Sequence, residues 1–304
     1  MNGTKPTLVL AHVTKSYGDF TAVSDLSLQV KAGRVFGLIG PNGAGKTTTI
    51  RMIVNITVPD SGRIELFGQP MTTALQDRIG YLPEERGLYR KMKVGEQLRF
   101  FAELKDLRGR EADRRIDLWL AKFQLTAWKE KRTKELSKGM QQKIQFITSV
   151  IHDPDLLILD EPFSGLDPIN VDIMKDTILE QKAANKTIIL STHQMGIAEK
   201  LCDDVCMINR SQKVLDGKLR DIRRSFSRNA VALRFEGGDG LLNDPEVVAN
   251  IRQAGDDFEV LLVPGVSPQI LLKRLVESGT TVTKFELVEP SLHDVFIAKV
   301  REAA

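Results

Sequence analysis

One stretch constrains the fold more than any other part of the chain, and it reads Gly40-Pro41-Asn42-Gly43-Ala44-Gly45-Lys46-Thr47-Thr48. It fits G-x-x-x-x-G-K-[ST], the pattern of a phosphate-binding loop. Glycines allow a tight turn whose backbone N–H groups face inward, and the helix that follows presents its positive end to the same phosphates. In this pattern Lys46 reaches the β- and γ-phosphates, and the Thr47 hydroxyl holds Mg²⁺. The loop therefore predicts a strand before it, a helix after it and a nucleotide between them.

The flanking residues fit this prediction. Residues 34–39 are almost continuously apolar and predict a buried strand, while residues 48–53 predict a helix. Strand, loop and helix in this order are the context that the motif needs, and the rest of the chain agrees with it.

Length and composition limit the classes of protein. The chain has 304 residues, 42% hydrophobic and 27% charged, which allows one large domain and a small one. Cys202 and Cys206 are the two cysteines, too few for a disulfide framework. No apolar run approaches a membrane span and no signal peptide is evident, so a cytosolic protein is expected. The net charge of +3 is too small to indicate nucleic acid.

The order of predicted elements indicates an α/β fold over residues 1–224. Apolar alternation predicts antiparallel strands at 7–14 and 21–30, and a continuous apolar run predicts a buried strand at 156–159. A helical period and few β-branched residues predict an inserted helical subdomain at about 85–152. We expect a mostly parallel, helix-covered sheet with an antiparallel β edge. The remaining predicted strands are 63–67, 79–83, 187–191, 205–209 and 213–216, and the remaining helices are 169–184 and 196–201.

The pattern changes near Ser225. Strands are predicted at 231–235, 258–263 and 281–288, and helices at 267–278 and 292–300. We expect residues 225–304 to form a separate, small α+β domain. This part contains no cluster of catalytic type.

Acidic residues and a histidine follow the predicted buried strands. Asp160 and Glu161 end the strand at 156–159, where one carboxylate can hold Mg²⁺ and the other can polarise a water for attack on the γ-phosphate. His193 follows the next strand. Because the ends of adjacent parallel strands lie side by side, His193 is expected to reach the same phosphate.

Together these motifs resemble the ATP-binding subunit of an ATP-binding-cassette (ABC) transporter, over about residues 7–224. The resemblance implies a P-loop NTPase core of ABC type that binds ATP and Mg²⁺ and hydrolyses ATP. The parts stand in the family's order: Tyr17, the phosphate loop, Leu82-Pro83-Glu84, Leu136-Ser137-Lys138-Gly139-Met140, Asp160-Glu161, Ser164-Gly165-Leu166-Asp167 and His193.

The resemblance also implies a role for each part. Tyr17 would stack on adenine, Asp160 would support Mg²⁺ together with Thr47 and Glu84, Glu161 would be the general base, and His193 would contact the γ-phosphate. The signature residues Ser137, Lys138, Gly139 and Met140 would bind the ATP of a second subunit. Two subunits, alike or different, would then enclose two ATP molecules, with Ser164 and Asp167 communicating across the dimer. Without the family, Ser137 is simply a candidate helix N-cap.

Two motifs depart from the family's usual pattern. Lys138 and Met140 replace a glycine and a glutamine of the signature, while Ser137 and Gly139 remain. Glu84 replaces the loop glutamine, which adds a negative charge beside the nucleotide and leaves the detail of Mg²⁺ ligation open.

The tail at 289–297 resembles that of exporter-type ABC ATPases whose permease is a separate membrane protein. We therefore expect a subunit that powers export, peripheral on the cytoplasmic face of the cell membrane, with an integral membrane permease as partner and no nucleic acid.

Residues 83–134 carry 15 Lys and Arg against 9 Asp and Glu, which fits a solvated helical face or a membrane- or partner-facing surface. A soluble ABC-type ATPase of translation or DNA maintenance is the alternative; another phosphate-loop enzyme, such as a small-molecule kinase, fits the signature and His193 less well.

Overall fold

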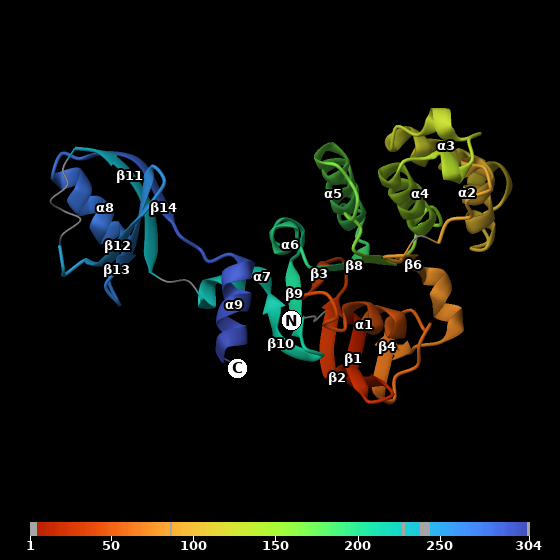
Figure 1. Ribbon diagram of the computed structural model, residues 1–304, viewed down its shortest axis with the longest axis horizontal. Helices are drawn as coiled ribbons and strands as arrows, with labels where there is room; N and C mark the ends of the chain where they lie inside the picture. Colours follow the sequence, from red (N-terminus) through yellow and green to blue (C-terminus); the bar gives the residue numbers. More distant parts are fainter. Residues whose placement is uncertain (1–4, 86, 227–228, 238–243, 303–304) are drawn as a thin grey trace. The chain divides into compact units, whose positions relative to one another are not determined.

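The structure is a computed structural model that describes residues 5–85, 87–226, 229–237 and 244–302. It divides the chain into two compact units, Met1–Lys218 and Leu219–Ala304. The divide falls a little before the predicted boundary at 224/225. The two units are described in turn (Figure 1).

Six strands form the central sheet of the first unit, in the order β10-β9-β3-β8-β7-β6. Neighbouring strands are parallel except β10, which is antiparallel to β9. Every residue of β3, β7 and β8 is buried, as expected for strands covered on both faces. Their bounds are β3 Val35–Ile39, β6 Ile79–Leu82, β7 Leu156–Asp160, β8 Thr187–Thr192, β9 Asp204–Asn209 and β10 Gln212–Lys218.

A second sheet has the order β2-β1-β4-β5 and is antiparallel throughout. Alternate residues of β1 and β2, such as Leu8, Leu10 and Val30, are buried. They share one hydrophobic core with α1 and with residues of the central sheet. The core thus joins the two sheets around α1 (Lys46–Ile53). The strand bounds are β1 Pro6–Tyr17, β2 Phe20–Lys31, β4 Ser61–Leu66 and β5 Gln69–Pro70.

The inserted helical subdomain contains α2 (Val94–Glu103), α3 (Gly109–Lys122) and α4 (Lys138–Val150). Figure 1 shows these three helices grouped at one end of the unit. The rings of Trp119, Phe123 and Phe146 pack between α3 and α4. Helices α5 (Pro168–Ala183) and α6 (Met195–Leu201) and the short helices η1 (Thr73–Arg78), η2 (Thr126–Trp128) and η3 (Thr133–Glu135) complete the unit.

The second unit contains an antiparallel sheet in the order β12-β13-β11-β14. Helix α8 packs on it through Leu271 and Leu275, which belong to a separate hydrophobic core. Strand β12 and helix α7 are absent from the sequence prediction. The bounds are α7 Leu219–Ser225, β11 Ala230–Glu236, β12 Val248–Ala254, β13 Asp257–Leu262, α8 Pro268–Glu277, β14 Thr281–Leu287 and α9 Leu292–Glu302.

The predicted α/β class is confirmed: a mostly parallel sheet, an antiparallel edge and inserted helices occur in the expected order. Within the described residues, no helix has the length and apolar character that crossing a bilayer requires.

Candidate functional site

The phosphate loop lies between β3 and α1, as its strand–loop–helix pattern predicts. Gly45 caps α1 in the left-handed conformation, at φ 108°. A Cβ added at Gly45 would lie 2.3 Å from the carbonyl oxygen of Ala22, and one at Gly40 would lie 2.1 Å from that of Ile208. Glycine is therefore required at both places, by close packing of the loop against β2 and β9.

Lys46 is buried within the loop that it follows. Its Nζ donates to the carbonyl oxygens of Gly40 at 2.9 Å and Pro41 at 3.1 Å, and it lies 3.9 Å from Glu161 Oε1. Burial lowers the pKa of Lys46, against the opposing effect of Glu161, Asp160 and Glu84. The Lys46 ammonium is thus held inside the turn of the phosphate loop, near the carboxylates of Glu161, Asp160 and Glu84.

Asp160 ends β7 with its side chain fully buried. The Ser191 hydroxyl donates to Oδ1, whereas Oδ2 has no hydrogen-bond partner among the described residues. Burial raises the pKa of Asp160, while the hydrogen bond from Ser191 lowers it in part. An unpaired buried carboxylate oxygen is unfavourable, so this position suits a cation.

Glu161 is held by the residues that end β8. Its Oε1 accepts from the backbone N–H of His193 at 2.9 Å and lies 2.8 Å from His193 Nδ1. Its Oε2 accepts from the Thr192 hydroxyl at 3.3 Å. The structure therefore brings Lys46, Asp160, Glu161 and His193 together from three places in the chain, namely the phosphate loop and the ends of β7 and β8.

A cavity of about 360 Å³ opens over the loop. Its lining includes Phe20 from β2 and Glu84 from the segment after β6, and it does not include Tyr17, which stands opposite Phe20 in the β1–β2 pairing. Sequence reasoning missed Phe20, although an aromatic residue next to the turn is a visible signal. The lining residues are Phe20, Ala22, Asn42, Gly43, Gly45, Lys46, Thr47, Thr48, Glu84 and Glu161.

Two glutamines of α4 hold loops of this site, and sequence reasoning missed both. Gln142 Nε2 donates to the carbonyl oxygen of Pro162, directly after Glu161, at 3.1 Å. Gln145 Nε2 donates to the carbonyl oxygens of Pro83 and Glu85 at 3.0 Å each. These contacts depend on how α4 packs against the sheet, which a single sequence does not reveal.

The signature residues lie at the start of α4, outside the cavity just described. The Ser137 side chain accepts from the backbone N–H of Met140 at 3.2 Å and caps the helix. Ser137 and Lys138 are exposed, and Gly139 and Met140 are half-buried. The surface is therefore available to a group from outside the unit.

The segment after Glu161 carries two further predicted residues. Ser164 is exposed, and its backbone N–H donates to the carbonyl oxygen of Glu161 at 3.1 Å. Asp167 caps α5 by accepting from the backbone N–H of Asn170 at 3.0 Å, and this contact lowers its pKa.

The described residues alone do not form a metal cage. Among them no group of three or more His, Cys, Asp or Glu side chains is placed to hold an ion. The Thr47 hydroxyl, the unpaired Asp160 Oδ2 and the nearby Glu84 carboxylate nevertheless fit Mg²⁺, which commonly takes few protein ligands and completes its shell with phosphates and water.

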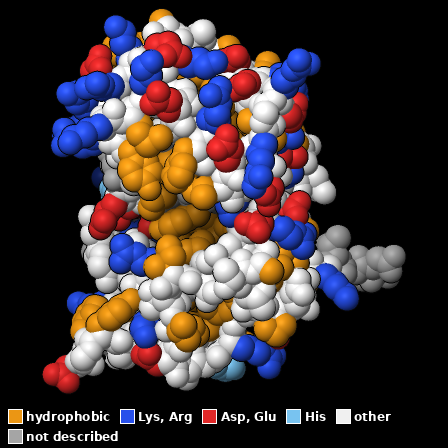
Figure 2. Space-filling model, turned by 90° about the vertical axis from the view of Figure 1, so that its right-hand side faces the viewer, with side chains coloured by type: hydrophobic (Ala, Val, Ile, Leu, Met, Phe, Trp, Pro, Cys, Tyr) orange, Lys and Arg blue, Asp and Glu red, His pale blue; other side chains and the backbone are white. Residues whose placement is uncertain are grey.

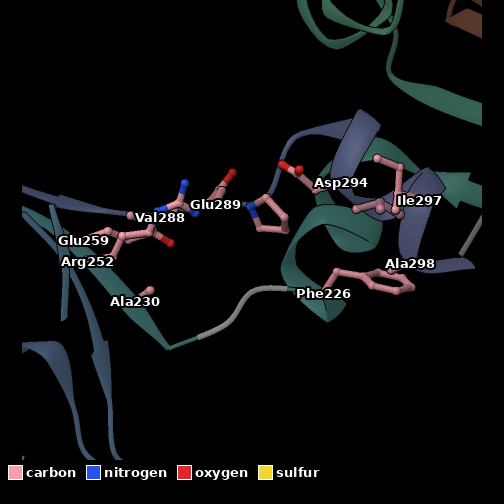
Figure 3. Close-up of a pocket in the computed structure, with 11 residues that line it drawn as sticks. Phe226, Ala230, Arg252, Glu259, Val288, Glu289, Asp294, Ile297 and Ala298 are labelled. Atoms are coloured by element: carbon pink, nitrogen blue, oxygen red, sulfur yellow. The ribbon is translucent and has the colours of Figure 1, made fainter. Parts of the chain in front are cut away.

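A second cavity, of about 440 Å³, lies in the C-terminal unit (Figure 3). Charged residues Arg252, Glu259, Glu289 and Asp294 line it, together with apolar ones such as Phe226. Of these two cavities, the smaller one over Lys46 is the one lined by residues of the phosphate loop.

Comparison with known proteins agrees with this geometry. Residues 23–164 match the ABC transporter family, and residues 217–300 match the C-terminal domain of ATP-binding proteins like DrrA1-3. An uncharacterized ABC transporter ATP-binding protein, YhaQ of Bacillus subtilis, is 43% identical over 96% of this chain and 98% of its own length. The chain belongs to the ABC transporter ATP-binding proteins.

Other ABC relatives extend the comparison. The Nod factor export ATP-binding protein I of Rhizobium meliloti is 39% identical over 97% of this chain and 89% of its own length. The solved structure of an ATP-binding subunit of an ABC transporter matches with a TM-score of 0.68 and 33% identity, covering 72% of this chain and 93% of that one. The ABC-type P-loop fold predicted from the motifs is thereby confirmed.

Another solved relative is cbiO1 of Clostridium perfringens, part of the ABC transporter complex cbiONQ. It matches with a TM-score of 0.63 and 27% identity, covering 72% of this chain and 94% of its own. These relatives carry transporter names, so they do not favour the alternative role in translation or DNA maintenance.

Proposed function

We propose that this ABC subunit hydrolyses ATP in a Mg²⁺-dependent manner and so powers export through a separate membrane permease. The observation that carries the proposal is the Glu161 carboxylate, buried between Lys46 and His193 and next to Asp160. This arrangement supplies a cation for phosphate, a base for water and a ligand for Mg²⁺ within one site.

Each residue has a separate part in the proposed reaction. The loop N–H groups and Lys46 bind and orient the phosphates, and a bound Mg²⁺ would neutralise charge on them. Glu161 accepts the proton of the attacking water, while His193 holds the Glu161 carboxylate in place and contacts the γ-phosphate. Thr47, Asp160 and Glu84 would hold the ion, and Phe20, which lines the cavity, offers an aromatic face to adenine in place of the Tyr17 expected from the family.

We further propose that two subunits enclose the nucleotides. The exposed start of α4 presents Ser137 and Gly139 with free access from outside the unit, and a backbone without a side chain at Gly139 suits a phosphate. Lys138 adds a positive charge to the same surface. Ser164 and Asp167 lie in the segment after Glu161, where they would meet the partner subunit.

An apolar groove is the proposed contact for the permease. Figure 2 shows hydrophobic side chains gathered around a hollow on one face of the molecule. The groove measures about 320 Å³ and is lined by the residues after α1 and by residues of η1, β6, α2 and α4. At its rim, Ile56 is 61% exposed and Leu104 is 59% exposed. Contiguous exposed apolar surface of this kind indicates a protein partner.

Export and peripheral membrane location are the finer parts of the proposal. They rest on the tail at 289–297 and on the relatives named for Nod factor export. We also propose that the unit Met1–Lys218 is the ATPase domain and that the unit Leu219–Ala304 is an accessory domain, since each has its own hydrophobic core.

The test is phosphate release by the purified chain, with and without its co-expressed permease. We expect MgATP turnover that Glu161→Gln abolishes while nucleotide binding persists. Turnover by the Glu161→Gln protein near that of the unsubstituted chain would reject Glu161 as the base. Failure of the unsubstituted chain to bind ATP would reject the proposed function itself.

A further inference from the structure

The Gln145 side chain connects α4 to the segment that carries Glu84. Its Nε2 donates to the carbonyl oxygens of Pro83 and Glu85 at 3.0 Å each, so the two bonds grip the backbone on either side of Glu84. Gln145 is 3% exposed. The two carbonyl acceptors require the NH₂ group at this end, which fixes the orientation of the amide.

The gripped segment has little regular structure of its own. Strand β6 ends at Leu82 and α2 begins at Val94, and the described residues between them form neither helix nor extended strand. Further along the segment, the backbone N–H of Tyr89 donates to Gln97 Oε1 at 2.6 Å. The two bonds from Gln145 are the side-chain hydrogen bonds that hold the backbone on both sides of Glu84.

The surroundings of Gln145 favour an apolar side chain. Gln145 lines the apolar groove together with Pro83, Thr148 and His152, and its Oε1 is buried with no hydrogen-bond partner among the described residues. A buried amide with an unpaired oxygen is unfavourable, and an aliphatic side chain would meet the groove without that penalty. The two hydrogen bonds to the segment around Glu84 account for an amide side chain at position 145.

We propose that Gln145 is a positioning residue for Glu84 and thereby sets how strongly nucleotide binding depends on Mg²⁺. The inference rests on the proposed function, in which Glu84 helps to hold the ion. Glu84 lines the cavity beside Lys46 and Thr47, whereas Gln145 is not among the residues that line it. Gln145 acts on the cation through Glu84 and has no contact with the nucleotide cavity itself.

The test is a double-mutant cycle read by equilibrium binding of a fluorescent ATP analogue to the full chain. Mg²⁺ is titrated against the unsubstituted chain, Gln145→Met, Glu84→Ala and the double variant. We expect Gln145→Met to raise the Mg²⁺ concentration at half-saturation roughly three- to tenfold, as for the loss of about one net hydrogen bond. Affinity in EDTA should stay unchanged, and Gln145→Met should have no further effect once Glu84 is Ala.

Thr148→Val is the matched control, because Thr148 lines the same groove and its hydroxyl donates within α4, to the backbone carbonyl oxygen of Gln145. It should leave the Mg²⁺ titration unchanged. Gln145→Leu serves as the second variant should Gln145→Met fold poorly by thermal unfolding. Additive effects in the cycle, or an equal loss of affinity in EDTA, would overturn the inference. In contrast, an unsubstituted chain that binds no nucleotide would overturn the proposed function.

Discussion

His193 holds the Glu161 carboxylate at two points, since its backbone N–H donates to Oε1 at 2.9 Å and its ring Nδ1 lies 2.8 Å from the same oxygen. Glu161 itself has φ 49°, in the left-handed region that residues with a side chain seldom occupy. Such a conformation persists where surrounding contacts determine it. The carboxylate at the end of β7 is therefore fixed in place by the end of β8.

Glu161→Gln should separate nucleotide binding from turnover. The amide keeps the size of the side chain and can still accept from the His193 N–H, but it cannot take a proton from water. Removal of a general base costs about 10²–10⁴-fold in rate, so turnover should fall at least that far. Phosphate release gives the rate and a fluorescent nucleotide gives the affinity.

Lys46→Ala should abolish nucleotide binding. The ammonium is the cation nearest to the loop carbonyls of Gly40 and Pro41, and its loss leaves the phosphates facing the carboxylates of Glu161 and Asp160. We expect affinity for MgATP to fall by 100-fold or more, on the order of 3 kcal/mol for a charge-assisted contact in a buried site. Isothermal titration checks this. Retained affinity would exclude the assigned role for Lys46.

Asp160→Asn should stabilise the protein without ligand and impair its response to Mg²⁺. Burial raises the pKa of Asp160 from its ordinary value of 3.8, so the folded state binds the proton more tightly than the unfolded state does. Stability that comes from this group is then present below 3.8 and is lost as pH rises through the raised pKa. The stability of the Asp160→Asn protein should not fall in this way as pH rises.

The expected gain at neutral pH is about 1 kcal/mol, in the range for relief of an unfavourable functional residue. Thermal unfolding of both proteins between pH 4 and 8 tests it. Equal unfolding temperatures across this range would contradict the argument.

Gly45→Ala should destabilise the loop. The added Cβ would lie 2.3 Å from the Ala22 carbonyl oxygen, and φ at this position is 108°. We expect a loss of about 1–3 kcal/mol in the free energy of unfolding. Gly43→Ala is the matched control, because a Cβ there meets nothing within 4 Å although φ is also positive, at 76°. Denaturant titration should rank Gly45→Ala as the more destabilised protein.

Removal of residues 219–304 should leave nucleotide binding intact. The residues that line the nucleotide cavity all lie before this segment, and the first unit has its own core. The truncated chain should bind a fluorescent ATP analogue within about twofold of the full chain. Loss of binding, with the circular dichroism spectrum of a folded protein retained, would show that the accessory unit contributes to the site.

Sequence reasoning succeeded where local pattern decides the structure. The continuous apolar run before Asp160 became β7, and the helix predicted after the phosphate loop begins at Lys46. It failed where pattern is weak: β12 is Val248–Ala254 and carries Asn250 and Arg252 in place of a clean apolar alternation.

Other features depend on tertiary packing. Gln142 and Gln145 look like ordinary residues of an amphipathic helix, and only the packing of α4 brings their amides to the two loops. Likewise, the cavity is lined by Phe20 and not by Tyr17, although the two residues stand opposite each other in the β1–β2 pairing.

Because Asp160 Oδ2 is unpaired, the unfolding temperature of the protein should report whether a cation is bound at this site. An ion that binds there would pair with this oxygen, which has no hydrogen-bond partner among the described residues. Anything that binds only the folded state raises the unfolding temperature as its concentration rises. Divalent cations and nucleotides can therefore be ranked by melting curves, with no transported substrate and no membrane partner present. The unfolding temperature can therefore be used to search for the ions and nucleotides that this protein binds.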